Sequence, residues 1–414
     1  MAESPHPGHP LGPGFWRLLV SSALSNLGDG LFKLGLPLVA IGFTRSPTLI
    51  AGVTFAVTLP WLLFALPAGA LADRLDRRLA MAGADAVRAG LLVALVAAAL
   101  LGAGNIWLLY AVGVCVGVAE TLYDTSAQSI LPQIVPRDRL SRANARLYAV
   151  ELTANEFVGP ALAGLIAATS MIATFGTPAA LWAAAAAVLL LIRGSYRAGR
   201  TRRTTLRADI AEGLRFLWRH RLLRTLAVMV GVGNFTQSAA MAILVLYAVG
   251  PESDMKLPVP AYGLLLTTFA VGSLAGSFLA ERLQHTLGRA RSLGLAIVTR
   301  ALPFAVLAVT ANPYLAGATF LLGGATNIVW NVITVSLRQR ITPDRLLGRV
   351  NSGYRLVAWG SMPLGAAAGG LLADVLGLRP VFAVMAVLTL TTLTGLTIVT
   401  DHHMATAELD NGQN

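Results

Sequence analysis

The sequence contains little charge, almost no lysine and a single cysteine. Only 13% of its 414 residues are charged, whereas a soluble globular chain carries about 25%. The hydrophobic share is 55% and the mean hydropathy is +0.67, so the composition predicts an integral membrane protein. The lone Cys115 excludes a disulfide within the chain, and its position in an apolar run favours a buried, unreactive thiol.

Several kinds of active site are also missing from the sequence. No His/Cys cluster has the spacing of metal ligands, no glycine-rich phosphate loop occurs, and no Ser/His/Asp or Cys/His set lies among the apolar runs. We therefore expect no metal, no cofactor and no enzymatic activity. The net charge of +12 would suggest nucleic acid as a partner, but the arginines lie in short loops between apolar runs, so no nucleic acid is expected.

Twelve apolar runs are long enough to cross a bilayer as helices, which takes about 20 residues each. They lie near 15–43, 49–71, 79–101, 105–131, 147–170, 174–193, 223–249, 260–284, 291–311, 313–336, 348–375 and 378–400. Residues 1–14 are rich in proline and glycine and lack the basic start of a cleaved signal peptide. The predicted fold class is all-α and integral to the membrane, with twelve transmembrane helices.

The basic residues are distributed unequally between the loops on the two sides of such a bundle. One set of loops carries only Arg45, Lys256 and Arg379. The other set carries residues 194–222 and Arg74, Arg77, Arg78, Arg137, Arg139, Arg142, Arg289, Arg291, Arg338, Arg340, Arg345 and Arg349. Because basic loops stay in the cytosol, we expect a multi-pass protein of the plasma (inner) membrane with both termini cytosolic.

Residues 194–222 divide the twelve runs into two groups of six. This segment is basic, and Leu206, Ile210, Leu214, Leu217 and Trp218 recur in it at helical spacing, which predicts an amphipathic helix on the inner membrane surface. We interpret it as a linker anchored to anionic lipid, with a regulatory role as the alternative. The predicted organisation is a cytosolic N-terminus at 1–14, bundles at 15–193 and 223–400 joined by the linker, and a tail at 401–414.

The two groups of runs contain matching sequences. Leu71-Ala72-Asp73-Arg74 is matched by Leu279-Ala280-Glu281-Arg282, and the loop at 136–144 is matched by the loop at 343–351. The two matches occur at nearly the same offset along the chain. With six helices in each copy, both copies face the same way, so the sequence predicts two parallel six-helix repeats with a substrate site between them.

A charged stretch separates the second and third apolar runs. Its residues of interest are Gly69, Asp73, Arg74, Arg77 and Arg78. The stretch resembles the loop between helices 2 and 3 of the major facilitator superfamily, although Asp76 stands where many members have glycine. The resemblance implies a secondary transporter with alternating access. It also implies that residues 69–78, with a weaker copy at Gly276, Glu281 and Arg282, close the cytosolic side without binding substrate.

Two carboxylates lie at the same predicted depth within the membrane. Asp29 and Glu120 each lie twelve residues from the cytosolic end of their helices, roughly 18 Å inside. Placing a charged group in hydrocarbon costs free energy, so each buried carboxylate is expected to have a function or a partner. In the superfamily, helices 1 and 4 line the central cavity, which implies a proton-coupling or cationic-substrate site here. The alternative is that Asp29 only pairs with Lys33, one turn along the same helix.

Other charged residues in the predicted helices are open to two interpretations. Asp124 and Glu156 fall at similar depth, and either a functional or a structural role fits them. Arg88, three residues from Asp85, and Arg300 lie on helices that are peripheral in the superfamily, which implies a structural role for both.

The second group of runs carries amides where the first carries acids. They are Asn234, Gln237, Asn327 and Asn331. We expect coupling to depend on the first bundle and the second to shape the substrate pocket, with Arg355 as a partner for a carboxylate of the cytosolic gate.

The fifth run contains Gly159-Pro160-Ala161-Leu162-Ala163-Gly164, in which proline favours a kink and glycine allows close packing. It resembles the antiporter motif of the superfamily, with Gly159, Pro160 and Gly164 at its motif positions. Asn26-Leu27-Gly28-Asp29-Gly30 and Asp85-Ala86-Val87-Arg88 resemble the branch of macrolide efflux proteins and enterobactin exporters. The arginine-containing helix 4 motif of many proton antiporters is absent from 114–123.

The resemblance implies a proton antiporter that exports a small amphiphilic or cationic drug, antibiotic or metabolite. The expected partners are this substrate, protons and membrane lipids, and the expected state is a monomer. A siderophore or metabolite exporter is the nearest alternative, followed by a nutrient importer and a non-transporting receptor.

Overall fold

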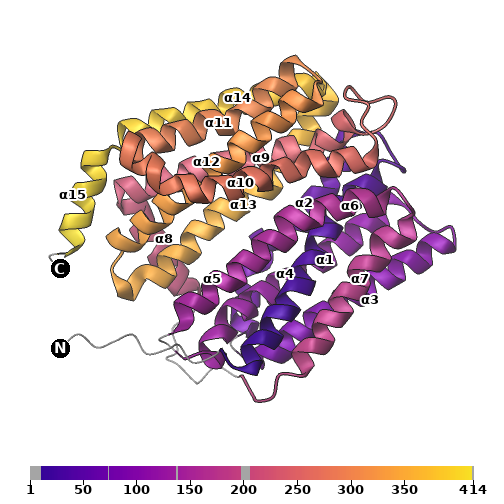
Figure 1. Ribbon diagram of the computed structural model, residues 1–414, viewed down its shortest axis with the longest axis horizontal. Helices are drawn as coiled ribbons and strands as arrows, with labels where there is room; N and C mark the ends of the chain where they lie inside the picture. The colour runs from indigo at the N-terminus through magenta and orange to yellow at the C-terminus, as the bar shows by residue number, and fades with distance from the viewer. Residues whose placement is uncertain (1–10, 73, 137–138, 197–205, 413–414) are drawn as a thin grey trace.

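The computed structural model describes residues 11–72, 74–136, 139–196 and 206–412, and these are mostly helical (Figure 1). The first part of the chain forms α1 (Pro13–Ala40), α2 (Pro47–Ala72), α3 (Arg77–Leu100), α4 (Ile106–Ile134), α5 (Leu140–Glu151), η2 (Leu152–Val158), α6 (Gly159–Ala167) and α7 (Met171–Leu190). The second part forms α8 (Leu206–Arg219), α9 (Arg221–Ala248), α10 (Val259–Leu287), α11 (Arg289–Val309), α12 (Pro313–Ile341), α13 (Asp344–Leu376), α14 (Leu378–Thr391), η3 (Thr392–Thr397) and α15 (Asp401–Gly412).

Within these described residues, ten helices are long and apolar enough to cross a membrane. Each predicted run falls on helix, with ends that differ by a few residues. Two runs are not among the ten. The first is α1, which is long but carries Arg17, Asp29 and Lys33. The other is the run at 147–170, which is divided into α5, η2 and α6 because a π-helical stretch precedes Pro160.

Side-chain caps explain where several helices begin. Asp76 accepts hydrogen bonds from the backbone N–H groups of Arg78 (3.1 Å) and Leu79 (3.4 Å) at the start of α3. Asn105 and Ser170 do the same at the starts of α4 and α7. These residue types are the preferred N-caps because their side chains satisfy N–H groups that have no partner within the helix.

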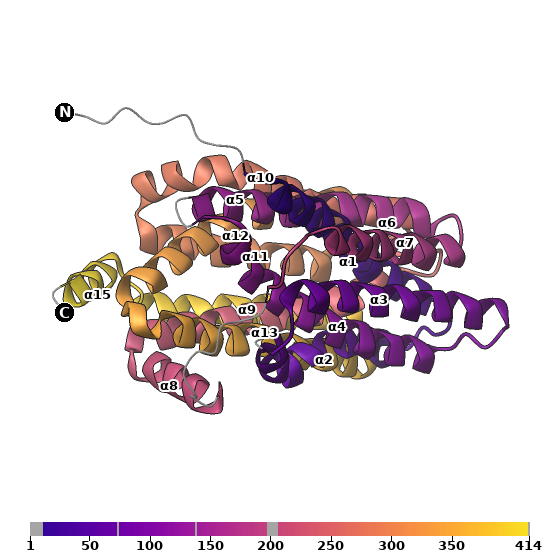
Figure 2. The same ribbon diagram turned by 90° about the horizontal axis from the view of Figure 1, so that it is seen from below.

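The helices form two groups that lie side by side (Figure 1). The N-terminal group contains α1 to α7, and the C-terminal group contains α8 to α15. Seen from below, α8 and α15 lie at one end of the molecule, which we call the terminal side (Figure 2). The main contacts between groups are α2 with α13 and α6 with α10. Gly164 approaches Gly263 closely in the second of these contacts, since a Cβ on either would lie 3.0 Å from the other's Cα.

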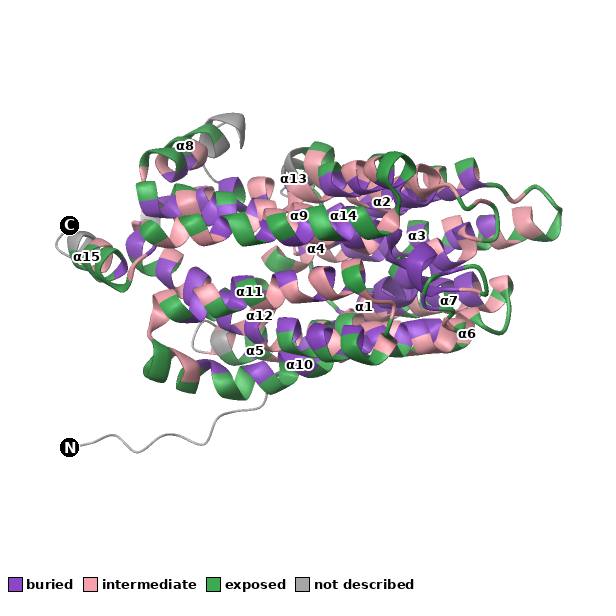
Figure 3. Cartoon of the chain, turned by 90° about the horizontal axis from the view of Figure 1, so that it is seen from above, coloured by how far each residue is buried: buried purple, intermediate pink, exposed green. Residues whose placement is uncertain are grey.

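The buried apolar residues explain how the groups are joined. One cluster contains residues of both groups, such as Phe32 and Trp182 together with Ile243 and Phe304. Two further clusters lie toward the terminal side, and each is confined to one group. The groups therefore share a core away from the terminal side and have separate cores near it. Exposed residues mark the outer faces of the helices (Figure 3).

The helix α8 packs against α13. Its Gly213 fits against the backbone of Arg349, and Glu212 forms an ion pair with Arg349. Leu217 is buried, whereas Trp218 is exposed. The predicted linker helix is thus present and rests partly on protein; its contact with lipid stays a prediction.

Candidate functional site

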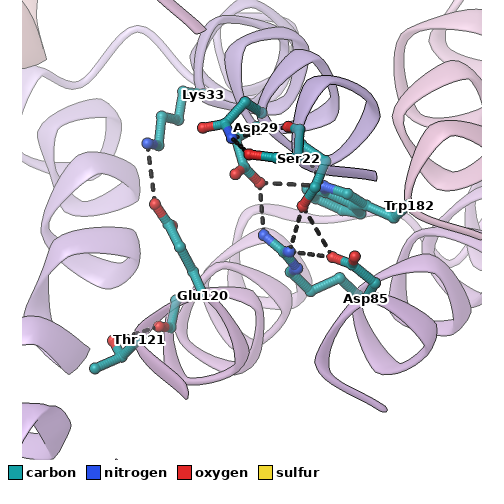
Figure 4. Close-up of polar contacts among 11 residues, drawn as sticks. Ser22, Asp29, Lys33, Asp85, Glu120, Thr121 and Trp182 are labelled. Atoms are coloured by element: carbon teal, nitrogen blue, oxygen red, sulfur yellow. Dashed lines mark hydrogen bonds and ion pairs between the residues drawn. The ribbon is translucent and has the colours of Figure 1, made fainter. Parts of the chain in front are cut away.

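A cluster of buried charged residues lies inside the N-terminal group (Figure 4). Its centre is Arg88 of α3, whose side chain is fully buried. Arg88 Nη1 donates to Asp29 Oδ1 on α1 at 2.6 Å, and Nη2 donates to Ser25 Oγ at 2.9 Å. Nη2 also forms an ion pair with Asp85, three residues earlier on α3. One guanidinium therefore holds two carboxylates from two helices.

Aromatic side chains enclose this cluster. The Arg88 guanidinium lies over the ring of Tyr123 at 4.9 Å and that of Trp182 at 4.8 Å. Trp182 also donates from Nε1 to Asp29 Oδ1 at 3.1 Å. A Cβ at Gly28 would lie only 2.7 Å from Trp182 Nε1, so the glycine makes room for the indole beside Asp29. The cluster is therefore held rigidly from three sides.

A second ion pair lies beside the cluster. Lys33 Nζ is 3.0 Å from Glu120 Oε1 on α4, and the side chains are 42% and 8% exposed. The alternative pairing of Asp29 with Lys33 is therefore wrong. Arg88 reaches Asp29 from α3, and Lys33 turns instead to Glu120. Arg88, for which a structural role is expected, lies at the centre of this buried network. Ser25 and Trp182 are not among the expected site residues, because serine and tryptophan give no distinct signal in an apolar helix.

The charges in this region do not balance. In the ion pairs among the described residues, three carboxylates, Asp29, Asp85 and Glu120, meet two cations, Arg88 and Lys33. If all five were ionised, the set would carry one negative charge inside a membrane span. Asp85 Oδ2 is buried without a hydrogen-bond partner. A single proton would neutralise the set and supply a donor, so the arrangement is suited to bind and release one.

The remaining candidates of this group lie at the edge of the cluster. Asn26 donates to the Ser22 carbonyl at 2.8 Å along α1. Asp124 is half-buried one turn from Glu120, and Glu156 is exposed on η2. The structure thus brings Asp29, Lys33 and Glu120 together and leaves these three outside the ion pairs it describes.

A cavity of about 550 Å³ lies in the C-terminal group. All four predicted amides line it: Asn234, Gln237, Asn327 and Asn331. Aromatic residues, including Trp330 and Trp359, form part of its wall, and Glu156 of η2 is the one lining residue from the N-terminal group among those the structure describes. The cavity is polar at some points and apolar at others, which is typical of sites for amphiphilic small molecules.

Three arginines line the same cavity. Arg300 of α11, which we expected to be structural, is half-buried and donates from Nη2 to Asn234 Oδ1 at 3.1 Å. Arg338 lies over the Tyr354 ring at 4.0 Å. Arg355 donates to Gln128 Oε1 of α4 at 2.6 Å, so its described partner across the groups is an amide and not the expected carboxylate.

Several polar residues occupy matching positions in the two groups. Glu120 and Asp124 lie fourteen and ten residues before the end of α4 at Ile134. Asn327 and Asn331 lie fourteen and ten residues before the end of α12 at Ile341. Asp29 on α1 and Asn234 on α9 are alike in another respect: each follows a glycine and each bonds an arginine. Carboxylates of one group thus stand where amides stand in the other.

The predicted gate residues lie at the terminal side. Arg77 Nη1 donates to the Ser129 carbonyl at 2.7 Å, and Arg78 donates to the Ile192 carbonyl. Arg74 is exposed, Gly69 lies on α2, and Asp73 lies outside the described residues. In the second copy, Gly276 packs against Ala325, while Glu281 and Arg282 are exposed.

The Asp76 carboxylate lies beside these arginines, outside the membrane spans. Burial raises the pKa of this carboxylate. Four hydrogen bonds lower it by more than burial raises it, so the pKa is below its usual value. The donors are the backbone N–H groups of Tyr196, Leu79 and Arg78 and the Ser195 hydroxyl. Asp76 is therefore ionised at neutral pH and joins the start of α3 to the segment after α7.

The glycine–proline motif lies where three helices meet. A Cβ at Gly159 would lie 2.8 Å from the Cα of Gly30 on α1, and Gly164 packs against Gly263 of α10. Pro160 follows the π-helical turn η2, whose last residue is Val158. The motif therefore joins a break in helical geometry to a contact between the two groups.

This arrangement of long apolar helices in two groups, with a polar cavity and buried charges, defines a multi-pass membrane protein with the fold of a transporter. The sequence matches the family described as transmembrane secretion effectors over residues 9–411. The protein belongs to this family of the major facilitator superfamily, and its expected family resemblance is confirmed.

Relatives and solved structures agree with this assignment. The chain is 30% identical to the MFS-type transporter y4rN of Sinorhizobium fredii, over 87% of this chain and 88% of the relative. It is 29% identical to the multidrug efflux pump Tap of Mycobacterium tuberculosis, over 91% and 90%. A bacterial homologue of the iron transporter ferroportin in an inward-facing state has a TM-score of 0.73 at 18% identity, over 94% and 99%. The nucleoside transporter NupG has a TM-score of 0.72 at 13% identity, over 93% and 98%.

Proposed function

We propose that this protein exports a small amphiphilic compound by proton antiport through alternating access. The single observation that carries the proposal is the buried set of three carboxylates and two cations around Arg88, which one proton would neutralise. The family assignment supports transport, and export is the activity that the name of the relative Tap states. A cationic substrate is less well supported, because three arginines line the cavity.

We further propose that twelve helices span the plasma membrane as two parallel six-helix repeats. The matching positions on α4 and α12 support the repeat, and so does the bond to an arginine that Asp29 on α1 and Asn234 on α9 each form. The helix α1 and the combined α5–η2–α6 stretch would be the two additional spans, since each runs over about 40 Å at 1.5 Å per residue. The basic loops favour the cytosol for the terminal side, and we assume a monomer.

The arrangement of the apolar cores supports an opening of the cavity toward the terminal side. They merge away from the terminal side and are separate toward it, so the cavity would be open to the cytosol in this state. In the outward-open state the contact at Gly164 and Gly263 would part, and residues 69–78 would approach the second group to close the cytosolic side. The break at η2 and Pro160 would let α6 tilt.

In the proposed cycle, a proton and the substrate bind the protein in turn. Loss of the proton inside leaves the Arg88 set with an unbalanced negative charge, which is costly in the membrane. A proton from the outer, more acidic side restores neutrality. Substrate release outside would accompany protonation, and the protonated protein would return inward. Asp29, Asp85 and Glu120 share this role as a coupled set, so no single carboxyl is assigned the proton.

The test is drug susceptibility in a host stripped of its own efflux pumps. Wild type and Asp29→Asn are compared on one panel of compounds, with and without a protonophore. We expect resistance to at least one compound, lost in Asp29→Asn and in the presence of the protonophore. Arg291→Gln, an exposed change on α11, serves as the control and should keep resistance. Resistance that survives both Asp29→Asn and the protonophore would contradict proton antiport. No resistance at all would favour a siderophore or metabolite exporter, or an importer, which uptake assays would separate.

A further inference from the structure

The charge of the cavity points to a class of substrate. Arg300, Arg338 and Arg355 line it, and Glu156 is the one acidic side chain among the described lining residues. No ion pair joins any of these three arginines to a carboxylate within the described part of the chain. The cavity therefore has a net positive charge, whereas the cluster around Arg88 has an excess of carboxylates.

Arg300 differs from Arg88 in what it is paired with. Arg88 is neutralised by Asp29 and Asp85, while Arg300 hydrogen-bonds only the neutral amide of Asn234 among described residues. Asn234 is itself fixed by donating from Nδ2 to the Ala358 carbonyl at 2.8 Å, so its oxygen faces Arg300. A cation inside a membrane protein is costly without a counter-charge and marks a functional site by default.

The surroundings hold the Arg300 guanidinium at the wall of the cavity. A Cβ at Gly233 would lie 2.8 Å from Arg300 Nη1 and 3.0 Å from its Cζ, so this glycine leaves the space that the guanidinium fills. Trp330 and Phe320 line the same cavity and offer apolar surface beside the charge. Guanidinium is suited to carboxylates because it can donate two parallel hydrogen bonds to them.

We infer that this cavity binds an amphiphile that carries a carboxylate, with Arg300 as the residue that pairs with it. The aromatic wall takes the apolar body, and Asn327 and Asn331 offer hydrogen bonds to polar substituents. The inference rests on the proposed function only in treating the cavity as the substrate site. The inference concerns substrate binding and not proton coupling, so the inference and the proposed function can fail separately.

The test uses three dansyl compounds that share one fluorophore and differ in charge: dansylglycine (anionic), dansylamide (neutral) and dansylcadaverine (cationic). Purified full-length protein in nonionic detergent is titrated with each, and energy transfer from Trp330 and Trp359 at the cavity wall reports binding. We expect dansylglycine to bind at least about tenfold more tightly than dansylcadaverine, which corresponds to ~1.4 kcal/mol.

The variants assign that preference to Arg300. Arg300→Gln should remove it, Arg300→Lys should keep part of it, and Arg291→Gln on the same helix should leave it unchanged. Melting curves of each variant separate loss of binding from loss of fold, and Arg300→Lys tests the charge if Arg300→Gln does not fold. Anionic lipid at equal concentration should not displace dansylglycine; displacement would assign the arginine to a lipid headgroup.

The proposal is overturned if dansylglycine does not bind the wild type, if the cationic probe binds as tightly, or if Arg300→Gln keeps the preference. Proton-dependent export together with a preference for cations would leave the proposed function intact and refute only this inference. Binding of dansylglycine without any proton-dependent export would support this inference and refute the proposed function.

Discussion

The two helix groups hold an arginine at matching positions and treat it differently. Arg88 of the N-terminal group bonds Asp29 and Asp85 and is sealed under Tyr123 and Trp182. Arg300 of the C-terminal group bonds an amide and lines an open cavity. The chemical difference lies in the partners of the two arginines, and it includes the exchange of the Asp29 carboxylate for the Asn234 amide. Arg88 is therefore part of a buried set of ion pairs, whereas Arg300 has no carboxylate partner among the described residues.

The same exchange of carboxylate for amide recurs between α4 and α12. Glu120 and Asp124 on α4 stand where α12 has Asn327 and Asn331. An amide keeps the size and hydrogen-bonding capacity of a carboxylate but does not titrate. The comparison shows that titratable carboxylates form the buried cluster of one half, while amides that do not titrate line the cavity of the other half.

The largest effect that should separate the halves is loss of the arginine itself. We expect Arg88→Leu to destabilise the protein by about 3–5 kcal/mol, because it leaves buried carboxylates without a counter-charge. Arg300→Leu should cost far less, since it leaves only a neutral amide. Thermal unfolding of both variants in the same detergent makes the comparison. Equal losses of stability would show that Arg300 is as structural as Arg88.

The glycines beside the two arginines should also respond differently. A Cβ at Gly28 meets the fully buried, rigid Trp182, so Gly28→Ala should destabilise the fold by about 1–3 kcal/mol through overpacking. A Cβ at Gly233 meets the flexible end of Arg300, so Gly233→Ala should change stability little and weaken dansylglycine binding. Melting temperatures and probe titrations of both variants are the measurement. A large loss of stability in Gly233→Ala would show that the end of the Arg300 side chain does not shift to accommodate the added methyl group.

Making the C-terminal half resemble the N-terminal half is the most direct test of the exchange. Asn234→Asp should give Arg300 a counter-charge and weaken dansylglycine binding about tenfold, or ~1.4 kcal/mol. The variant keeps a contact with Arg300 like the existing hydrogen bond of 3.1 Å but loses the hydrogen bond that Asn234 donates to the Ala358 carbonyl, so a moderate loss of stability is expected and melting curves accompany the titrations. Gln237→Glu, at another position on the cavity wall without a described bond to Arg300, is the matched control. Dansylglycine affinity that is unaltered in Asn234→Asp would count against Arg300 as the anion site.

The smallest expected effect concerns the starts of α3 and α11, each of which is capped by an aspartate. Asp76 caps α3 from within its own segment, whereas Asp401 of α15 accepts from Arg289 N–H at 2.9 Å and caps α11 from a distance. Asp76→Ala should cost about 1 kcal/mol, and Asp401→Ala, an exposed change, should cost less. The Asp76 contribution should be present above the unfolded pKa of about 3.9 and be lost as pH falls through its lower folded pKa. Melting temperatures across acidic pH, with Asp76→Ala showing the weaker pH dependence, are the check.

Much of the architecture could be predicted from the chain alone. Low charge and long apolar runs required a membrane protein, because such a chain cannot be solvated otherwise. The runs located helices whose ends differ by only a few residues, and the Asp73-Arg74 motif identified the superfamily. The buried acids Asp29 and Glu120 and the amides of the cavity stood out because polar residues are rare in such runs.

The partners of those residues were decided only by the tertiary structure. From the sequence, Lys33 is only the local alternative as a partner of Asp29; in the structure Arg88 from another helix bonds Asp29, and Lys33 bonds Glu120. Arg300 was expected to be structural and lines the cavity instead. The reason is physical: helices that are apolar on nearly every side give no periodic signal of which face is turned inward. Packing among helices far apart in the sequence sets that rotation, and with it which charges meet.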